Sequence, residues 1–439
     1  MKLYVGIDIS KTSCVAAFLS HENTTKRPAL LHFAQSRSGF EALSARMRSL
    51  APLAECTVLV EHTGHYAHPL LQFLHEQGVA CSMLHVQERD RRKQKSDRRD
   101  AQALCRLLYN QQALGVEAEA GSRLYPLLAP APHALRLSAL THHYEDVTVG
   151  IVARLNRLTA ICDEVFPEFT RIFKDPNLLI ALAYREHFPT PALLACATID
   201  DLRALRRRSF PSEKQLVELQ RLARESIGVK NADRLDGLLL EQQHLIAELR
   251  LLQSERADLE VKITAIVEGC REGQILTSIP GIGMIQAGIL IAAIGTIANF
   301  RRAADLKSYC GWAPREVQTG TTSDSRYLPR GGNGSLRRLF YLATMTAIGH
   351  DTEFRALYQR LLPLKCSYDA RTKRYRGAKK LIGRIAGQLI TLVYALLQHD
   401  HEVLAALKEG EEAPTPVLYD REIHRRHRSG HYIPLKHAR

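Results

Sequence analysis

The sequence has 439 residues, a formal net charge of +14 at pH 7 and a pI near 9.4. This length exceeds one ordinary core and predicts about three domains, and the excess of 60 Lys and Arg over 46 Asp and Glu indicates a polyanionic partner. We expect no signal peptide and no membrane span, because no run of about 18 apolar residues is present. The nine cysteines form no CxxC pair, which indicates reduced core residues in a cytoplasmic protein and excludes a disulfide framework.

The N-terminal segment alternates strand and helix patterns. An apolar strand and turn at 3–11 carry Asp8, and the next patterns predict strands at 14–19 and 30–34, a helix at 39–50, a strand at 57–60 ending on Glu61, a helix at 67–77 and a strand at 80–84. This order is typical of an RNase-H-like fold. An acid inside a buried strand is costly unless it is paired or binds a cation, so Asp8 is a candidate site residue.

Residues 95–101 read KSDRRDA and begin a predicted helix that continues to Asn110. Asp97 and Asp100, three positions apart, would project from one helix face. Two carboxylates about 4 Å apart repel by roughly 4 kcal/mol, so neighbouring arginines or a divalent metal must compensate. In an RNase-H-like sheet, Asp8 and Glu61 can lie on adjacent strands while this helix brings in the other two acids. Such convergence predicts a two-metal site, and carboxylate ligands suit Mg²⁺ or Mn²⁺.

Three of these segments together resemble a known family. Residues 6–11 (GIDISK), 61–66 (EHTGHY) and 95–101 (KSDRRDA) are similar to the RuvC-like domain of the DEDD transposases of the insertion-sequence-110 family, which includes Piv-type DNA invertases. The resemblance implies that Asp8, Glu61, Asp97 and Asp100 are the family's acidic quartet.

The middle of the chain has a different pattern. Prolines at 126, 130 and 132 indicate a linker, and a helical pattern follows at 134–165. A heptad seam then continues for more than four repeats and predicts a coiled coil; its positions are Leu235, Leu238, Gln242, Leu245, Leu249, Leu252, Arg256, Leu259, Ile263 and Ile266. This seam has two possible partners, a second copy of the chain or the helix at 134–165 in an antiparallel hairpin. The resemblance also implies a coiled coil between the family's two catalytic parts.

A second motif region begins with a turn at 279–283 (IPGIG) before an apolar helix at 286–294. The turn resembles a helix-hairpin-helix, in which Gly281 and Gly283 would offer backbone N–H groups to a phosphate; such turns also serve plain packing. Residues 309–315 (YCGWAPR), 318–320 (QTG) and 330–338 (RGGNGSLRR) follow in the order of the family's C-terminal transposase domain.

One position departs from that family pattern. Thr319 stands where the resemblance implies a nucleophilic serine. A threonine hydroxyl can attack phosphorus, although its methyl group would crowd the approach. Three hypotheses remain: Thr319 is the nucleophile, nearby Ser323 or Ser325 replaces it, or the protein is catalytically impaired.

Basic residues around these motifs are candidates for nucleic-acid contacts, with plain solvated charge as the alternative. The candidates are Lys95, Arg98, Arg99, Arg315, Arg330, Arg337 and Arg338. A further basic run at 371–384 surrounds Tyr375 and is expected to contact a phosphate backbone. After residue 412 we expect a flexible tail rich in Arg and His.

The sequence therefore predicts a multidomain protein of α/β plus all-α class. Its parts would be an RNase-H-like (RuvC-like) domain at 1–126, a helical coiled-coil domain at 127–272, a helical C-terminal transposase domain at 273–400 and a basic tail at 401–439. The resemblance implies a recombinase that forms a covalent protein–DNA intermediate at a Mg²⁺ site, acts on donor and target DNA as a homo-oligomer (dimer or tetramer), and is guided by a structured noncoding RNA. The alternatives are a metal-dependent junction resolvase or nuclease, and a noncatalytic nucleic-acid-binding descendant.

Overall fold

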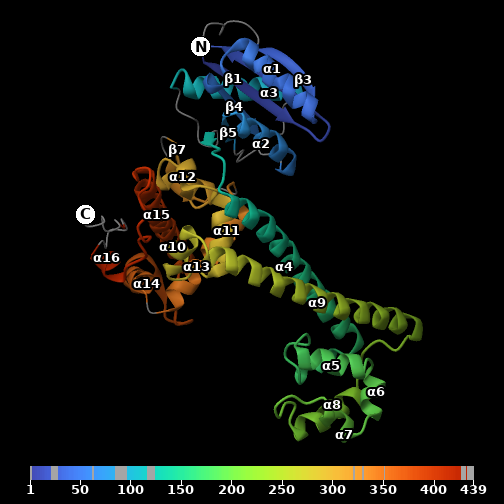
Figure 1. Cartoon of the computed structure of the whole chain (residues 1–439). Helices are drawn as coiled ribbons and strands as arrows, with labels where there is room; N and C mark the ends of the chain where they lie inside the picture. Colours follow the sequence, from blue (N-terminus) through green and yellow to red (C-terminus); the bar gives the residue numbers. More distant parts are fainter. Residues whose placement is uncertain are drawn as a thin grey trace. The chain divides into compact units, whose positions relative to one another are not determined.

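The computed structural model describes residues 2–20, 28–61, 64–84, 96–115, 124–319, 322–328, 331–350, 352–426 and 432. The chain forms two compact units, one made of Met1–Ser138 with Ala265–Arg439 and one made of Ala139–Thr264 (Figure 1). The first unit contains an N-terminal α/β part and a C-terminal, mainly helical part, and the second unit is helical.

A six-stranded mixed sheet forms the centre of the N-terminal part, in the order β3-β2-β1-β4-β5-β6. The first three strands are antiparallel neighbours, β1, β4 and β5 run parallel, and β6 is antiparallel at the edge. The strands are β1 (Leu3–Ile9), β2 (Ser13–Ser20), β3 (Ala29–Ala34), β4 (Cys56–Glu61), β5 (Ala80–Leu84) and β6 (Leu124–Pro126). The predicted α/β class is confirmed, and β6 is a strand that the sequence pattern did not predict.

Helices cover both faces of this sheet (Figure 1). Side chains of β1 alternate between the two faces: Val5 and Ile7 join a core with α1 (Arg37–Leu50) and α2 (His68–Glu76), whereas Tyr4 joins a core with α3 (Asp97–Gln112). Burial on both faces explains why β1 is apolar throughout, apart from half-buried Asp8.

Two long helices, α4 (Pro132–Val165) and α9 (Ala232–Glu268), supply the body of the helical unit. They lie antiparallel, since Arg157 bonds to Glu241 while Tyr144, earlier in α4, bonds to Glu260, later in α9. All ten predicted seam positions of α9 are buried or half-buried. The partner of α9 is therefore α4 of the same chain. This is the antiparallel hairpin, one of the two partners that the sequence left open for the seam.

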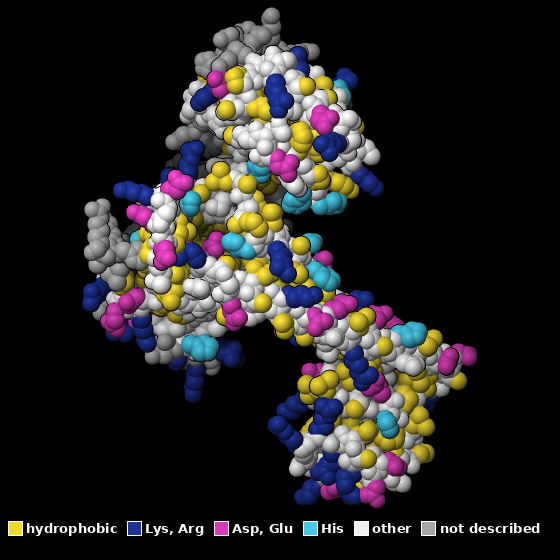
Figure 2. Space-filling view, viewed as in Figure 1, with side chains coloured by type: hydrophobic (Ala, Val, Ile, Leu, Met, Phe, Trp, Pro, Cys, Tyr) yellow, Lys and Arg dark blue, Asp and Glu magenta, His cyan; other side chains and the backbone are white. Residues whose placement is uncertain are grey.

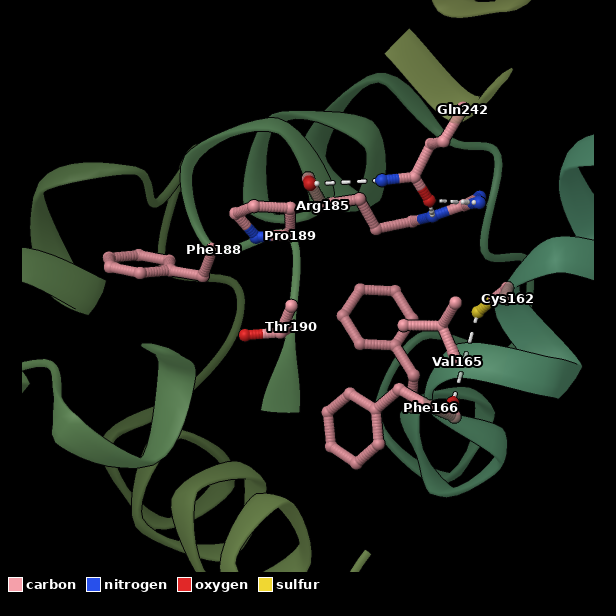
Figure 3. Close-up of a pocket in the computed structure, with 9 residues that line it drawn as sticks. Cys162, Val165, Phe166, Arg185, Phe188, Pro189, Thr190 and Gln242 are labelled. Carbon is pink, nitrogen blue, oxygen red and sulfur yellow. Dashed lines mark hydrogen bonds between the residues drawn. The ribbon is translucent and has the colours of Figure 1, made fainter. Parts of the chain in front are cut away.

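Four short helices complete the helical unit: α5 (Leu179–His187), α6 (Pro191–Cys196), α7 (Ile199–Ala204) and α8 (Glu213–Arg224). Their core includes Phe169, Phe173 and Tyr184. Figure 3 shows a small pocket beside it, in which Arg185 of α5 meets Gln242 of α9. The seam position Gln242 thus joins α5 to α9.

The C-terminal part is built around α15 (Ala378–Ala405), which packs against α12, α13 and α14. Its helices are α10 (Arg271–Ser278), α11 (Met284–Ile294), α12 (Ala303–Tyr309), α13 (Gly334–Gly349), α14 (Glu353–Lys365), α15 and α16 (Arg421–Arg426). By length and composition α15 could cross a membrane, but 56% of its apolar window is buried inside the protein. The expectation of a purely helical domain needs correction, because two β-hairpins interrupt the helices: β7 (Arg315–Thr319) with β8 (Thr322–Tyr327), and β9 (Ser367–Asp369) with β10 (Arg374–Arg376).

The expectation of a flexible tail after residue 412 is wrong for its first part. The Arg271 guanidinium donates to the Pro414 carbonyl at 2.6 Å, and the Tyr419 amide donates to Ser278 Oγ at 2.9 Å. Glu353 at the start of α14 lies 3.0 Å from Arg421 and 3.1 Å from Arg425. These contacts fix residues 414–425 on α10 and α14.

Candidate active site

The strands place two of the four predicted acids side by side. In the parallel pairing of β1 with β4, Ile7 lies opposite Val60. The next residues along the two strands are Asp8 and Glu61, so both acids reach the same end of the sheet at the ordinary spacing of about 4.8 Å between strands. Both side chains are half-buried, in strands whose remaining residues are mostly apolar and buried.

The other two acids come from α3, whose position is set by Gly6. A Cβ at Gly6 would lie 2.2 Å from the Cys105 nitrogen and 2.5 Å from the Ala101 oxygen, so the helix backbone rests directly on β1. Farther along α3, the Tyr109 ring meets Tyr4 at 5.4 Å between centroids. The helix therefore runs antiparallel to β1, with its first turn towards Asp8.

Helix and strand dimensions then locate the first turn. Asp97 precedes Ala101 by four residues, which is about 6 Å along a helix, and Asp8 follows Gly6 by two residues, which is about 6.6 Å along a strand. Since Ala101 lies over Gly6, Asp97 and Asp100 reach the end of the sheet that carries Asp8. Gly6 is thus a positioning residue that the sequence analysis missed, although a glycine inside a strand is a known sign of close backbone approach.

Local sequence explains why α3 begins at this place. Ser96 is the N-cap and its Oγ accepts from the Arg99 amide at 3.4 Å. Asp97 and Asp100 occupy the first turn, where the helix dipole favours negative charge. Arg98 points to another partner, because its Nε contacts His32 Nε2 at 3.1 Å. Arg99 is exposed.

The quartet does not form a group of three ligand atoms within 4.8 Å of one another among the described residues. Among the described residues, the one group of three potential ligands within 4.8 Å of one another is His133, Cys270 and Glu272. Carboxylates repel one another and approach closely only around a cation. An all-carboxylate donor set on a rigid sheet and helix suits Mg²⁺ or Mn²⁺. The residues present therefore fit such an ion.

The His133 group has a simpler explanation. His133 Nε2 lies 3.3 Å from Glu272 Oε2, within the distance of an ion pair when the imidazole is protonated. Burial raises the pKa of the Cys270 thiol, so at neutral pH this sulfur is a neutral neighbour of the pair.

Thr319 lies at the end of β7 in the β7–β8 hairpin. Its backbone pairs with Thr322, and the register shifts between Val317 and Thr319. Ser323 and Ser325 belong to β8, with Ser325 opposite Val317. Arg315 begins β7. The side chains of this hairpin, as well as Lys95 and Arg330, lie outside the described residues.

Two of the C-terminal motifs pack on each other next to this hairpin. Gly311 and Gly332 both have positive φ, 72° and 92°, and a Cβ at Gly332 would lie 2.6 Å from the Gly311 Cα. The Arg337 guanidinium donates to the Gly331 carbonyl and lies against Gly311. Arg337 thus holds the two loops together, whereas Arg338 is exposed on α13.

The glycines of the 279–283 turn are used within the protein. Gly281 has φ of 94°, and a Cβ there would lie 2.3 Å from the Ala343 oxygen. The Gly283 amide donates to Gln286 Oε1 at 2.9 Å. This geometry favours the packing role of the turn over a phosphate contact.

The pocket of the helical unit is also structural (Figure 3). Arg185 is 5% exposed and its guanidinium donates to Gln242 Oε1 and to the carbonyls of Leu158 and Pro176. Three phenylalanines, Phe166, Phe169 and Phe188, line the remaining wall. Because its N–H groups already donate to neutral acceptors of the chain, the Arg185 guanidinium stabilises the packing of the helical unit and is not positioned to bind a ligand.

Comparisons with known proteins relate both parts of the first unit to one group. Residues 273–359 match the model described as "Transposase IS116/IS110/IS902 family", and residues 5–167 match a DEDD transposase model of the same group. The latter match includes all four acids of the quartet, and the former includes Thr319.

Individual relatives agree with these matches. The chain is 28% identical over 266 residues to the "Insertion element IS110 uncharacterized 43.6 kDa protein" of Streptomyces coelicolor, covering 60% of this chain and 62% of that protein. It is 25% identical over 156 residues to the "Transposase for insertion sequence element IS1111A" of Coxiella burnetii, covering 35% and 40%. It is 30% identical over 128 residues to the "Pilin gene-inverting protein" of Moraxella bovis, covering 29% and 37%. The chain thus spans less than two thirds of each of these three relatives.

Proposed function

The chain belongs to the IS110-type family of DEDD transposases, and from this premise we propose that it is a DNA transposase or site-specific recombinase that cleaves and exchanges DNA strands. The observation that carries the proposal is the convergence of β1, β4 and α3, which brings four acids to one end of the sheet. The strand order around β1 supports an RNase-H-like fold for this part. The antiparallel pair α4–α9 supports a coiled-coil domain between the two catalytic parts.

Asp8, Glu61, Asp97 and Asp100 would hold the divalent metal, Mg²⁺ or Mn²⁺. When bound, such ions activate an attacking oxygen and stabilise the charge on the leaving one. The protein's own contribution is rigidity, because the quartet comes from two paired strands and a capped helix rather than from loops.

The Thr319 hydroxyl is the proposed nucleophile. Its oxygen forms a bond to the phosphorus of a phosphodiester, the bond from phosphorus to the leaving oxygen breaks, and the departing strand end takes up a proton. The result is a covalent protein–DNA link that a second strand end can resolve. Ser323 or Ser325 in β8 would replace Thr319 in the second version of the mechanism, and a catalytically impaired protein would form no link at all.

The proposed partners follow from the same assignment. Donor and target DNA are the substrates, a structured noncoding RNA selects the target, and a homo-oligomer joins the quartet to the hydroxyl of the C-terminal domain. We propose that the sugar-phosphate backbone is contacted by Arg98, Arg99 and Arg338. The net charge of +14 supports a polyanionic partner. The cytoplasm is the proposed location.

The test is a search on denaturing gels for a protein–DNA adduct, with donor and target duplexes, Mg²⁺ and the RNA transcribed from the flank of the element. Wild type is compared with Thr319→Ala, Asp97→Ala and the control Asp236→Ala, which changes an exposed acid of α9. The proposal predicts an adduct in wild type and in the control, and none in the other two variants.

A metal-dependent nuclease is the second candidate, because the quartet alone suffices for hydrolysis by an activated water. It predicts cleavage without an adduct, retained in Thr319→Ala and lost in Asp97→Ala. Binding that survives Asp8→Ala, with no cleavage in any metal, would identify the noncatalytic descendant.

A further inference from the structure

We propose that the β9–β10 hairpin is a binding site for unpaired nucleotides of a nucleic-acid strand, a role that rests on the proposed function as a nucleic-acid enzyme. The hairpin joins α14 to α15 and lies outside both matched segments, 5–167 and 273–359. None of the residues assigned above to catalysis belongs to this hairpin.

An exposed pair of aromatic rings is the first feature of this site. Tyr368 of β9 lies directly opposite Tyr375 of β10, and the ring centroids are 5.2 Å apart at 62°. The two residues remain 58% and 36% exposed. Large rings that no element covers are open to a flat partner, and stacking on aromatic side chains is the main way in which proteins hold unpaired bases.

The charge around these rings is strongly positive. Residues 365–380 contain seven Lys or Arg and a single acid, Asp369. That acid is already used within the hairpin: its Oδ1 accepts from the Arg371 amide at 3.0 Å, and its Oδ2 accepts from the Arg376 guanidinium at 2.6 Å. Asp369 thereby closes the turn without neutralising the cations at the tip.

Three cations at the tip have no acid beside them among the residues that the structure describes. Within the part of the chain that the structure describes, no carboxylate lies within 4.0 Å of Arg371, Lys373 or Arg374, and all three are exposed. The helical unit differs, since most of its arginines have a carboxylate partner: Arg154, Arg157, Arg203, Arg206, Arg221, Arg234, Arg250 and Arg256. Figure 2 accordingly shows acidic and basic side chains interspersed over that unit.

The rings and the cations together indicate which form of nucleic acid binds, a single strand or a duplex. Cations alone would serve any phosphate backbone, whereas the rings need a base face, which a regular duplex hides inside its stack. The partner is therefore a single-stranded segment, either a loop of RNA or DNA unpaired during strand exchange.

The experiment measures the binding of full-length protein by fluorescence anisotropy, with about 12-nucleotide oligo(U) RNA, oligo(dT) of the same length and a duplex as labelled probes. Tyr368→Leu/Tyr375→Leu should weaken binding of a single strand at least tenfold, about 1.4 kcal/mol, and should change duplex binding less than twofold. Tyr368→Phe/Tyr375→Phe keeps the rings and should bind as wild type. If the leucine variant loses more affinity for oligo(U) than for oligo(dT), the partner is RNA, and the opposite result identifies DNA.

A charge variant keeps the proposal testable if loss of the rings loosens the hairpin. Arg371→Gln/Lys373→Gln/Arg374→Gln leaves the ring pair intact and should lower the salt slope for a single strand by about 0.7 per lost contact. Arg224→Gln/Lys230→Gln/Lys262→Gln removes the same charge from exposed positions of the helical unit and should leave the slope unchanged.

Two results would overturn the inference: single-strand binding unchanged in both hairpin variants, or an equal loss on duplex and single strands in the tyrosine variant. Failure of the proposed function as a recombinase would give a different result. Wild type would then form no protein–DNA adduct and cleave nothing, while hairpin-dependent binding of single strands could persist.

Discussion

The position of α3 depends on the missing side chain at Gly6, so Gly6→Ala should dismantle the candidate site without removing a functional group. A Cβ there would lie 2.2 Å from the Cys105 nitrogen, whereas real contacts lie beyond 3.0 Å. The helix and strand must therefore separate by roughly 0.8 Å, at a cost of about 3 kcal/mol because neither backbone can turn aside. Misplacement of Asp97 and Asp100 by this distance should reduce cleavage roughly 100-fold.

Hydrogen exchange is the appropriate assay for this change, because the single tryptophan, Trp312, belongs to the C-terminal part and does not report on the sheet. Amides of α3 should exchange roughly 100-fold faster in Gly6→Ala. Gly237→Ala is the matched control: no atom lies within 4 Å of its added Cβ, so it should stabilise α9 slightly. Unchanged exchange and cleavage in Gly6→Ala would refute the placement of α3.

Three further outcomes are expected. Gln242→Leu should destabilise the helical unit by about 2 kcal/mol in thermal unfolding, because it removes Gln242 Oε1, one of the acceptors of the buried Arg185 guanidinium. The change at its exposed neighbour, Gln243→Leu, should cost little, and equal effects would contradict the role of the Arg185–Gln242 pair. Burial alone would raise the pKa of Glu353, but hydrogen bonds from Arg421 and Arg425 hold this pKa below its ordinary value. The ionised pair therefore stabilises the docked tail above the ordinary range of Glu and loses its effect as pH falls through the lowered pKa, so proteolysis of residues 414–425 should speed up on acidification in wild type and vary less with pH in Glu353→Gln. Chelation of divalent ions should abolish cleavage while DNA binding persists; cleavage that withstands chelation would exclude a metal role for the quartet.

Local sequence patterns were sufficient to predict the strands and the helix that carry the quartet. The apolar run around Asp8 could only be a buried strand, and the strand ending on Glu61 has the same character. Ser96 followed by Asp97 and Asp100 has the composition of a helix N-terminus, and α3 begins at Asp97 as its sequence indicates. In each case the decisive residues are neighbours in sequence.

Features that depend on distant residues could not be predicted in this way. The sequence predicts Gln242 as a seam position of the heptad pattern, and only the fold shows that Arg185 donates a hydrogen bond to it. The tail looked flexible from its composition, although Glu353 and Arg271 fix it in place. The β9–β10 hairpin was missed because its three-residue strands carry almost no periodic signal. The strands β7 and β8 are longer but mostly polar, so they show no apolar alternation.

We propose that a hydroxyl of the β7–β8 hairpin attacks DNA with the help of the acidic quartet. The most direct measurement is mass spectrometry of the adduct after nuclease and protease digestion, which identifies the residue that carries the nucleotide. We predict a nucleotide linked through phosphate to Thr319, in an adduct that requires Asp97 and divalent metal. A nucleotide on any residue outside Thr319, Ser323 and Ser325, or DNA cleavage with no linked residue at all, would contradict it.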